Sequence, residues 1–144
     1  MVTSIFCFAY LLLISLSDIR SMRIPNGMLM ALFTSVFCTD ISSAYGSIIT
    51  RLLCALMFTG IFYLVAKYTK GFGAGDVKLS GVIGYCNGFY RGLIVFGTSV
   101  LFGIIFYVIY STFRRKINVI PFAPFVCLGF VFSEIYFRSG YAIF

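Results

Sequence analysis

Two aspartates, Asp18 and Asp76, are the residues of this sequence best placed to carry out chemistry on a substrate, and the chain has only four acidic residues among its 144. Asp18 closes the first apolar run. Asp76 lies in the glycine-rich stretch KGFGAGDVKLSG, at the head of another apolar run. Two carboxylates held close together share a proton, so one can activate water while the other protonates a leaving amine. The pair is a candidate hydrolytic dyad if the fold brings it together.

The residues needed for other hydrolytic devices are scarce. The chain has no histidine, which removes Ser-His and Cys-His arrangements. None of its five cysteines is paired as C-x-x-C, so we predict no metal site. The stretch GFGAGD matches neither of the glycine-rich phosphate-binding patterns. By elimination, an enzyme with this sequence would be an aspartic hydrolase.

Both aspartates also have purely structural interpretations. Asp18 could cap the end of a helix or pair with Arg20 or Arg23 in water, and Asp76 could be the first-turn acid of a helix. The glycines before Asp76 could form a simple turn. They could instead leave an unwound helix entry at which an extended substrate lies. These alternatives stay open at the level of residue types.

The composition predicts an all-α, polytopic integral membrane protein with a single membrane-embedded domain over residues 1–144. Hydrophobic residues make up 61% of the chain and charged residues 10%, and the mean hydropathy is +1.05. A single small soluble core cannot bury so much apolar surface. Helices are favoured because an open sheet would leave backbone groups unpaired in lipid.

Charged and turn residues divide the chain into six apolar blocks, which predict about six transmembrane helices. The first block ends at Asp18 and a basic loop, so we expect a retained span rather than a signal peptide. The blocks are Val2–Ser17, Asn26 or Gly27 to Thr39, Ile48–Ala66, Val77–Tyr90, Gly92–Phe113 and Ile117–Phe137.

The basic residues predict how these spans are oriented. With six spans, eight basic residues fall on one side of the membrane and three on the other. The positive-inside rule puts the first set in the cytoplasm, with both termini outside. Asp18 and Asp76 then share the cytoplasmic face. The basic residues are scattered between apolar blocks, so no nucleic-acid partner is expected. The cytoplasmic set is Arg20, Arg23, Lys67, Lys70, Lys78, Arg114, Arg115 and Lys116, and the other set is Arg51, Arg91 and Arg138.

Three short motifs carry a resemblance to a known family. GAGDVKL, residues 73–79, is similar to the G-x-G-D-x-K-L signature of type IV prepilin peptidases, a branch of the GxGD membrane aspartic peptidases. SDIRSMRIPN, residues 17–26, resembles that family's first-aspartate segment, D-x-x-x-x-x-I-P-N. PFAPF, residues 121–125, resembles its P-F-G-P-F, with Ala123 in place of glycine. The motifs occur in the family's order.

The resemblance implies a membrane aspartic endopeptidase of the bacterial inner membrane, with its active site toward the cytoplasm. It would remove the short basic leader from prepilins or pseudopilins, and the lipid bilayer and the pilus or secretion machinery would be its other partners. By motif match, Asp18 and Asp76 would be catalytic. The residues that would bind substrate or shape the site are Gly73, Gly75, Lys78, Pro25, Asn26, Pro121, Phe122 and Pro124.

The chain also departs from the long members of that family. Those members carry a zinc-binding insert with paired C-x-x-C motifs after the first aspartate, and only about ten residues separate Asp18 from the second block here. The resemblance is therefore to the compact form. Long members also methylate the new N-terminus with S-adenosylmethionine, and no residue here argues for that activity, so no cofactor is expected for cleavage. A small proton-coupled transporter and a non-catalytic pilus-assembly factor remain as alternative functions.

Overall fold

A computed structural model describes residues 2–41, 45–69, 73–113 and 121–141, and all the regular structure in these ranges is helical. The all-α prediction is confirmed. The five helices are α1 (Val2–Ser21), α2 (Asn26–Ile41), α3 (Tyr45–Thr69), α4 (Ala74–Phe113) and α5 (Ala123–Tyr141).

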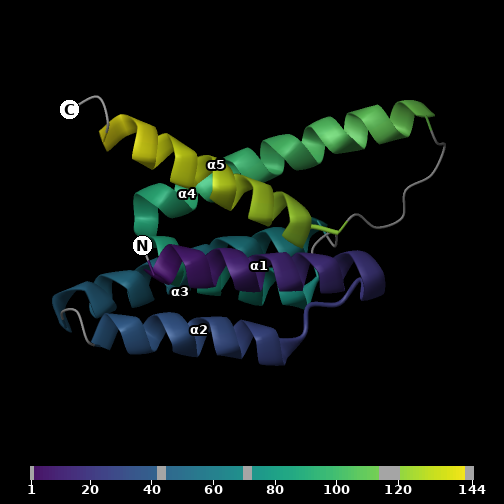
Figure 1. The fold of residues 1–144 in the computed structure, drawn as a ribbon. Coiled ribbons are helices and arrows are strands. Elements are labelled where there is room, and N and C mark those ends of the chain that lie inside the picture. Colours follow the sequence, from purple (N-terminus) through teal and green to yellow (C-terminus); the bar gives the residue numbers. More distant parts are fainter. Residues whose placement is uncertain (1, 42–44, 70–72, 114–120, 142–144) are drawn as a thin grey trace.

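The helices form an up-and-down bundle in which consecutive segments run back and forth (Figure 1). Helix α4 contacts both α3 and α5, and α1 packs between α2 and α5. The second half of α4 turns away from α3 and crosses α5 (Figure 1). The start of α1 and the end of α5 lie at one end of the molecule. The end of α1 and the starts of α2, α4 and α5 lie at the other.

The prediction of six separate spans is not confirmed, because the fourth and fifth apolar blocks form one 40-residue helix, α4. A straight helix of that length would measure about 60 Å, twice the thickness of the hydrocarbon layer. The helix instead breaks at Gly88, which has φ 69° and ψ −168°. Only glycine adopts this conformation readily. Just before it, the Asn87 side-chain amide donates to the Ile83 carbonyl at 3.1 Å and satisfies an acceptor at the break.

Several other predicted boundaries were wrong by a few residues. Helix α1 continues to Ser21, so Asp18 lies in its last turn rather than after it. Helix α4 begins at Ala74, three residues before the predicted start. The last helix begins at Ala123, and residues 117–120 of the predicted block lie outside the described residues. Helix ends are poorly marked by apolar content alone, because backbone capping decides them.

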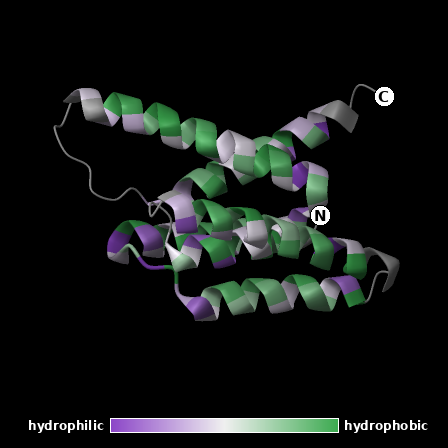
Figure 2. Ribbon diagram, turned by 180° about the vertical axis from the view of Figure 1, so that it is seen from behind, coloured by the Kyte–Doolittle hydropathy of each residue, from purple (hydrophilic) through white to green (hydrophobic). Residues whose placement is uncertain are grey.

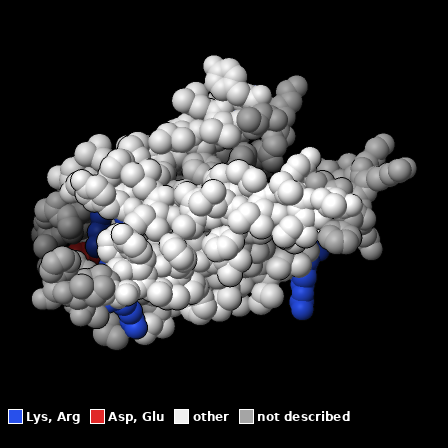
Figure 3. Space-filling view, turned by 90° about the horizontal axis from the view of Figure 1, so that it is seen from above, with Lys and Arg blue, Asp and Glu red and all other residues white. Residues whose placement is uncertain are grey.

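The surface of the bundle is apolar, as expected of a multi-pass membrane protein. By length and composition, candidate membrane spans lie at Ser4–Ser21, Ile48–Tyr68 and Ala74–Tyr110, and Asn26–Ile41 is a shorter apolar helix. Apolar residues run along the helices, while hydrophilic residues gather toward the helix ends (Figure 2). In the view from above, an uncharged surface fills the centre and charged side chains appear near the margins (Figure 3).

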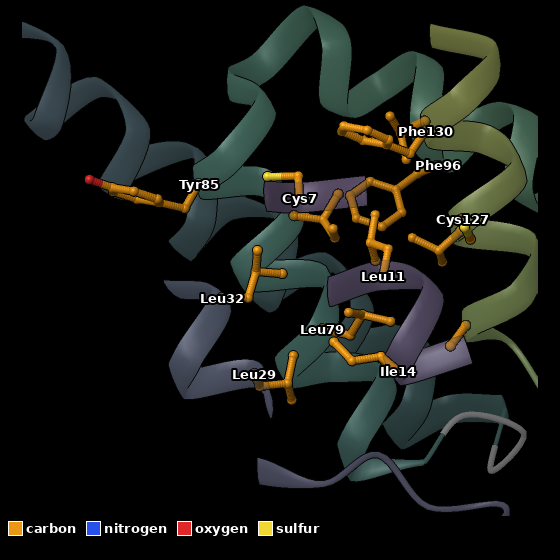
Figure 4. Close-up of a cluster of buried hydrophobic side chains, with 14 of the residues drawn as sticks. Cys7, Leu11, Ile14, Leu29, Leu32, Leu79, Tyr85, Phe96, Cys127 and Phe130 are labelled. Carbon is orange, nitrogen blue, oxygen red and sulfur yellow. The ribbon is translucent and has the colours of Figure 1, made fainter. Parts of the chain in front are cut away.

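A compact core joins all five described helices, and Figure 4 shows part of it. Leu11 and Ile14 of α1, Leu32 of α2 and Leu79 of α4 are fully buried. Phe130 of α5 and Cys7 of α1 extend this cluster toward the far end of the bundle. The packing fixes α1 against both α4 and α5, and these are the helices that carry the two aspartates and the PFAPF motif.

Two ion pairs lie away from the Asp18 end of the bundle. Arg51 donates to the buried Asp40 at 3.0 Å, joining α2 to α3. Arg91 donates to Glu134 at 3.3 Å, joining α4 to α5 just after the Gly88 break, and its guanidinium lies 4.7 Å from the centre of the Phe137 ring. These pairs satisfy charges that would be costly to leave unpaired near lipid.

The break in α4 gives a direct test of the fold. Replacing Gly88 by alanine should lower the free energy of unfolding by about 1–3 kcal/mol, because a side chain is strained at this φ and ψ. Gly97→Ala in the same helix is the matched control: its added methyl group meets open space, and stability should stay equal or rise. Thermal unfolding of both variants in detergent measures the difference. Equal melting temperatures would contradict a required break at Gly88.

Candidate active site

A pocket of about 320 Å³ opens at the end of the bundle where α1 finishes and α2 and α4 begin. Its walls come from the last turn of α1, the connection to α2 and the first turn of α4. Both aspartates of the predicted dyad line it. The lining residues are Asp18, Met22, Arg23, Ile24, Asn26, Gly73, Ala74, Gly75, Asp76 and Lys78.

Asp18 is buried, with 6% of its surface exposed, although it bears a carboxylate. Its Oδ2 accepts a hydrogen bond of 3.1 Å from the backbone N–H of Ala123, the first residue of α5. A helix N-terminus carries partial positive charge and unpaired N–H groups, so it stabilises a carboxylate placed there. The Asp18 side chain therefore caps a helix distant in sequence. Among the described residues, Asp18 forms no ion pair with Arg20 or Arg23.

Asp76 is half-buried in the first turn of α4 and caps its own helix. The N–H of Gly73 donates to Asp76 Oδ2 at 3.0 Å, and the N–H of Asp76 donates back to the Gly73 carbonyl at 3.0 Å. The first bond is one half of a capping box, in which the third helical residue accepts the N–H of the residue before the helix, and the second bond is a backbone turn. The structural interpretation of Asp76 as a first-turn acid is therefore realised. The helix is already wound at Gly75, so the expected unwound entry can extend no further than Gly73.

The two carboxylates face a common space from different helices. They line the same pocket and lie close enough to interact electrostatically. Each accepts a hydrogen bond from a backbone amide, and a carboxylate has further lone pairs that can accept from water or share a proton. A water between them could lose a proton to one carboxylate while the other protonates a leaving group. The arrangement thus has the components of an acid–base dyad.

The connection between α1 and α2 forms one wall of the pocket. Met22 has φ 52°, a left-handed conformation that is common just after a helix end, and its N–H donates to the Asp18 carbonyl at 2.9 Å. The Ser21 hydroxyl donates to the Ser17 carbonyl at 2.8 Å and lies 3.4 Å from the Arg23 carbonyl, at the point where the chain reverses. Ile24 then packs on Gly75, where an added Cβ would lie 3.1 Å from Ile24 Cβ. Glycine at position 75 is thus required by close approach.

A polar contact ties α2 to α4 beside the dyad. The Lys78 ammonium donates to Asn26 Oδ1 at 3.1 Å, across 52 residues of sequence. Asn26 is the first residue of α2, and Lys78 follows Asp76 by two positions. The bond therefore fixes the start of α4 relative to the connection that follows Asp18.

The structure brings six of the ten predicted site residues to the pocket and places the other four behind it. Asp18, Asp76, Gly73, Gly75, Lys78 and Asn26 line the pocket. Pro25, Pro121, Phe122 and Pro124 do not.

Three of the four outlying residues lie at helix starts. The Pro25 carbonyl accepts the N–H of Met28 at 3.1 Å and starts α2. The Phe122 carbonyl accepts the N–H of Phe125 at 3.1 Å and starts α5, with Pro124 in its first turn. Proline suits such positions because its missing N–H would have no helical partner there.

Reasoning from residue types missed part of the site. The pocket is also lined by Met22, Arg23, Ile24 and Ala74. The first three lie between Asp18 and the I-P-N motif, and this short spacing was the signal that could have indicated them. Ala123 contributes through its backbone N–H alone. Because only its backbone N–H takes part, the residue type at this position gives no sign of its contact with Asp18.

Comparisons with known proteins identify a family for this chain. The model of the type IV leader peptidase family matches residues 5–108, well over half of the chain and both aspartates. A Bacillus subtilis (strain 168) protein named prepilin leader peptidase/N-methyltransferase is 29% identical over 129 residues, which cover 88% of this chain and 52% of that relative. The chain thus spans about half the length of this curated relative. No solved structure matches. The chain belongs to the type IV leader peptidase family.

Proposed function

We propose that this protein is a membrane aspartic endopeptidase that removes the short basic leader from type IV prepilin-like substrates. The observation that carries the proposal is the convergence of Asp18 and Asp76 on one pocket, each held by a backbone amide. Membership of the leader peptidase family and the name of the Bacillus subtilis relative support the choice of substrate.

The reaction needs only water and the two carboxylates. One carboxylate removes a proton from water as its oxygen attacks the carbonyl carbon of the scissile peptide bond. The other donates its proton to the leaving nitrogen, the C–N bond breaks, and the products are a new carboxyl terminus and a new amine. No cofactor takes part in the proposed cleavage. Methyl transfer is part of the relative's name and is not proposed for this chain.

We further propose that the Asp18–Asp76 end faces the cytoplasm, in the inner membrane. Within the described part of the chain, the cations at this end form no ion pair; they are Arg20, Arg23, Lys67 and Lys78. Two arginines elsewhere in the bundle are paired with acids. The excess of positive charge at the pocket end supports this orientation. The apolar segment of the prepilin would lie in the bilayer, and its leader would reach the pocket from the cytoplasm.

Removing either carboxylate should abolish cleavage. Asp18→Asn and Asp76→Asn should each lower kcat by about 10²–10⁴-fold, because each variant loses one proton-transfer group. Glu134→Gln removes the same charge outside the pocket and should cleave nearly normally. A gel-shift assay with a prepilin in liposomes measures the rates, and size-exclusion chromatography checks that each variant is folded. Near-normal cleavage by either aspartate variant would disprove the dyad, and would favour a transporter or a non-catalytic factor.

The contact between Gly75 and Ile24 should be needed for cleavage. Gly75→Val would push the connecting wall away from the first turn of α4 and misplace Asp76, and we expect a loss of about 10²-fold in kcat. The double variant Gly75→Val with Ile24→Ala removes the Ile24 atoms beyond Cβ that crowd position 75, and it should recover part of the rate. Gly27→Ala, at a glycine with open space around it, is the control. Absence of recovery in the double variant would show that Gly75 acts in another way.

Anionic lipids should help the enzyme to bind its substrate. The basic leader meets cations at the pocket end, and anionic headgroups attract each basic residue by about 1 kcal/mol. Replacing phosphatidylglycerol with phosphatidylcholine should raise KM about fivefold or more and leave kcat unchanged. A prepilin with a neutral leader should respond little. An unchanged KM for the basic leader would rule out this contribution of the membrane surface.

A further inference from the structure

The first turn of α5 has an unusual distribution of backbone N–H groups. Pro124 has none, and the N–H of Phe125 is taken by the Phe122 carbonyl at 3.1 Å. The N–H of Ala123 has no partner within its own helix, and it donates to Asp18 Oδ2 at 3.1 Å. The amide of Phe122 also interacts with this carboxylate. The start of α5 thus directs the N–H of Ala123 at the carboxylate of Asp18, at the end of α1.

This contact is buried on both sides. Ala123 has none of its surface exposed and Asp18 has 6%. A buried carboxylate that lost its donor would face the full cost of desolvation, so the bond holds the carboxylate against α5. Because Oδ2 accepts this hydrogen bond, the Asp18 carboxylate cannot rotate freely about its Cβ–Cγ bond.

Aromatic packing holds the amide itself in place. The Phe122 ring lies 5.9 Å from the Phe62 ring of α3, and the Phe125 ring lies 5.5 Å from the Phe106 ring of α4. These contacts lie on both sides of Ala123 in the sequence. The start of α5 is therefore fixed to α3 and α4, and the N–H of Ala123 is fixed with it.

We propose that Ala123 is a positioning residue, whose backbone N–H orients the Asp18 carboxylate toward the pocket. The inference rests on the proposed peptidase function and adds a role for a residue that has no reactive side chain. Ala123 does not contact the substrate in this arrangement. It acts through Asp18.

The decisive experiment removes the N–H and keeps the side chain. Ala123→lactic acid, introduced by nonsense suppression, replaces the N–H with an ester oxygen. We expect kcat for prepilin cleavage to fall about ten- to a hundredfold, as for loss of a hydrogen bond to a charged group, with KM within twofold of wild type. Ala123→Gly keeps the N–H and should retain kcat. Leu128→leucic acid places the same ester in the middle of α5, at an exposed side chain, and should cleave nearly normally.

The rates are measured on the monodisperse fraction of each variant, so a lower yield does not alter the result. Ala123→Pro is a second variant that lacks the N–H, and proline suits the first position of a helix. If it fails to fold, the ester variant decides alone. An ester variant with kcat within twofold of wild type, or with a raised KM and normal kcat, would overturn the positioning role. Wild-type protein that cleaves no prepilin would instead refute the proposed function, independently of Ala123.

Discussion

The structure depends on how an apolar bundle accommodates a buried carboxylate. Asp18 is almost fully enclosed, and near lipid an unsatisfied charge would be expensive. The protein satisfies it with the N-terminus of α5, whose unpaired N–H groups need an acceptor as much as the carboxylate needs donors. One contact therefore meets two requirements, and it joins the first helix of the chain to the last.

The same principle recurs at Asp76 with a different partner. There the donors and acceptors belong to one helix turn. Asp76 Oδ2 accepts the N–H of Gly73, and the Gly73 carbonyl accepts the N–H of Asp76. Both carboxylates thus stabilise helix starts as well as lining the pocket. Structural and chemical roles are combined in the same two side chains, which explains how a chain with four acids can devote two of them to one pocket.

Much of this arrangement could be predicted from residue types and their order. The apolar blocks predicted a helical membrane protein. The division of the basic residues between the two sides of the membrane predicted that Asp18 and Asp76 lie at the same end of the bundle. The sequence predicted a boundary between Tyr90 and Gly92, but it did not identify Gly88 as the residue at which α4 breaks, since the φ of a glycine is invisible in sequence. The pocket wall formed by Met22 to Ile24 was missed because it depends on the left-handed backbone conformation of Met22. The role of Ala123 depends on a backbone group that every non-proline residue has.

The bond between Ala123 and Asp18 also has a consequence for biosynthesis, because it spans 105 positions of sequence. Translation proceeds from the N-terminus at about 5–20 residues per second, so α1 is made many seconds before the start of α5 exists. During that interval Asp18 lacks its donor from α5. The Asp18 carboxylate gains this donor only when α5 has been made, so a partly synthesised chain holds Asp18 by fewer contacts.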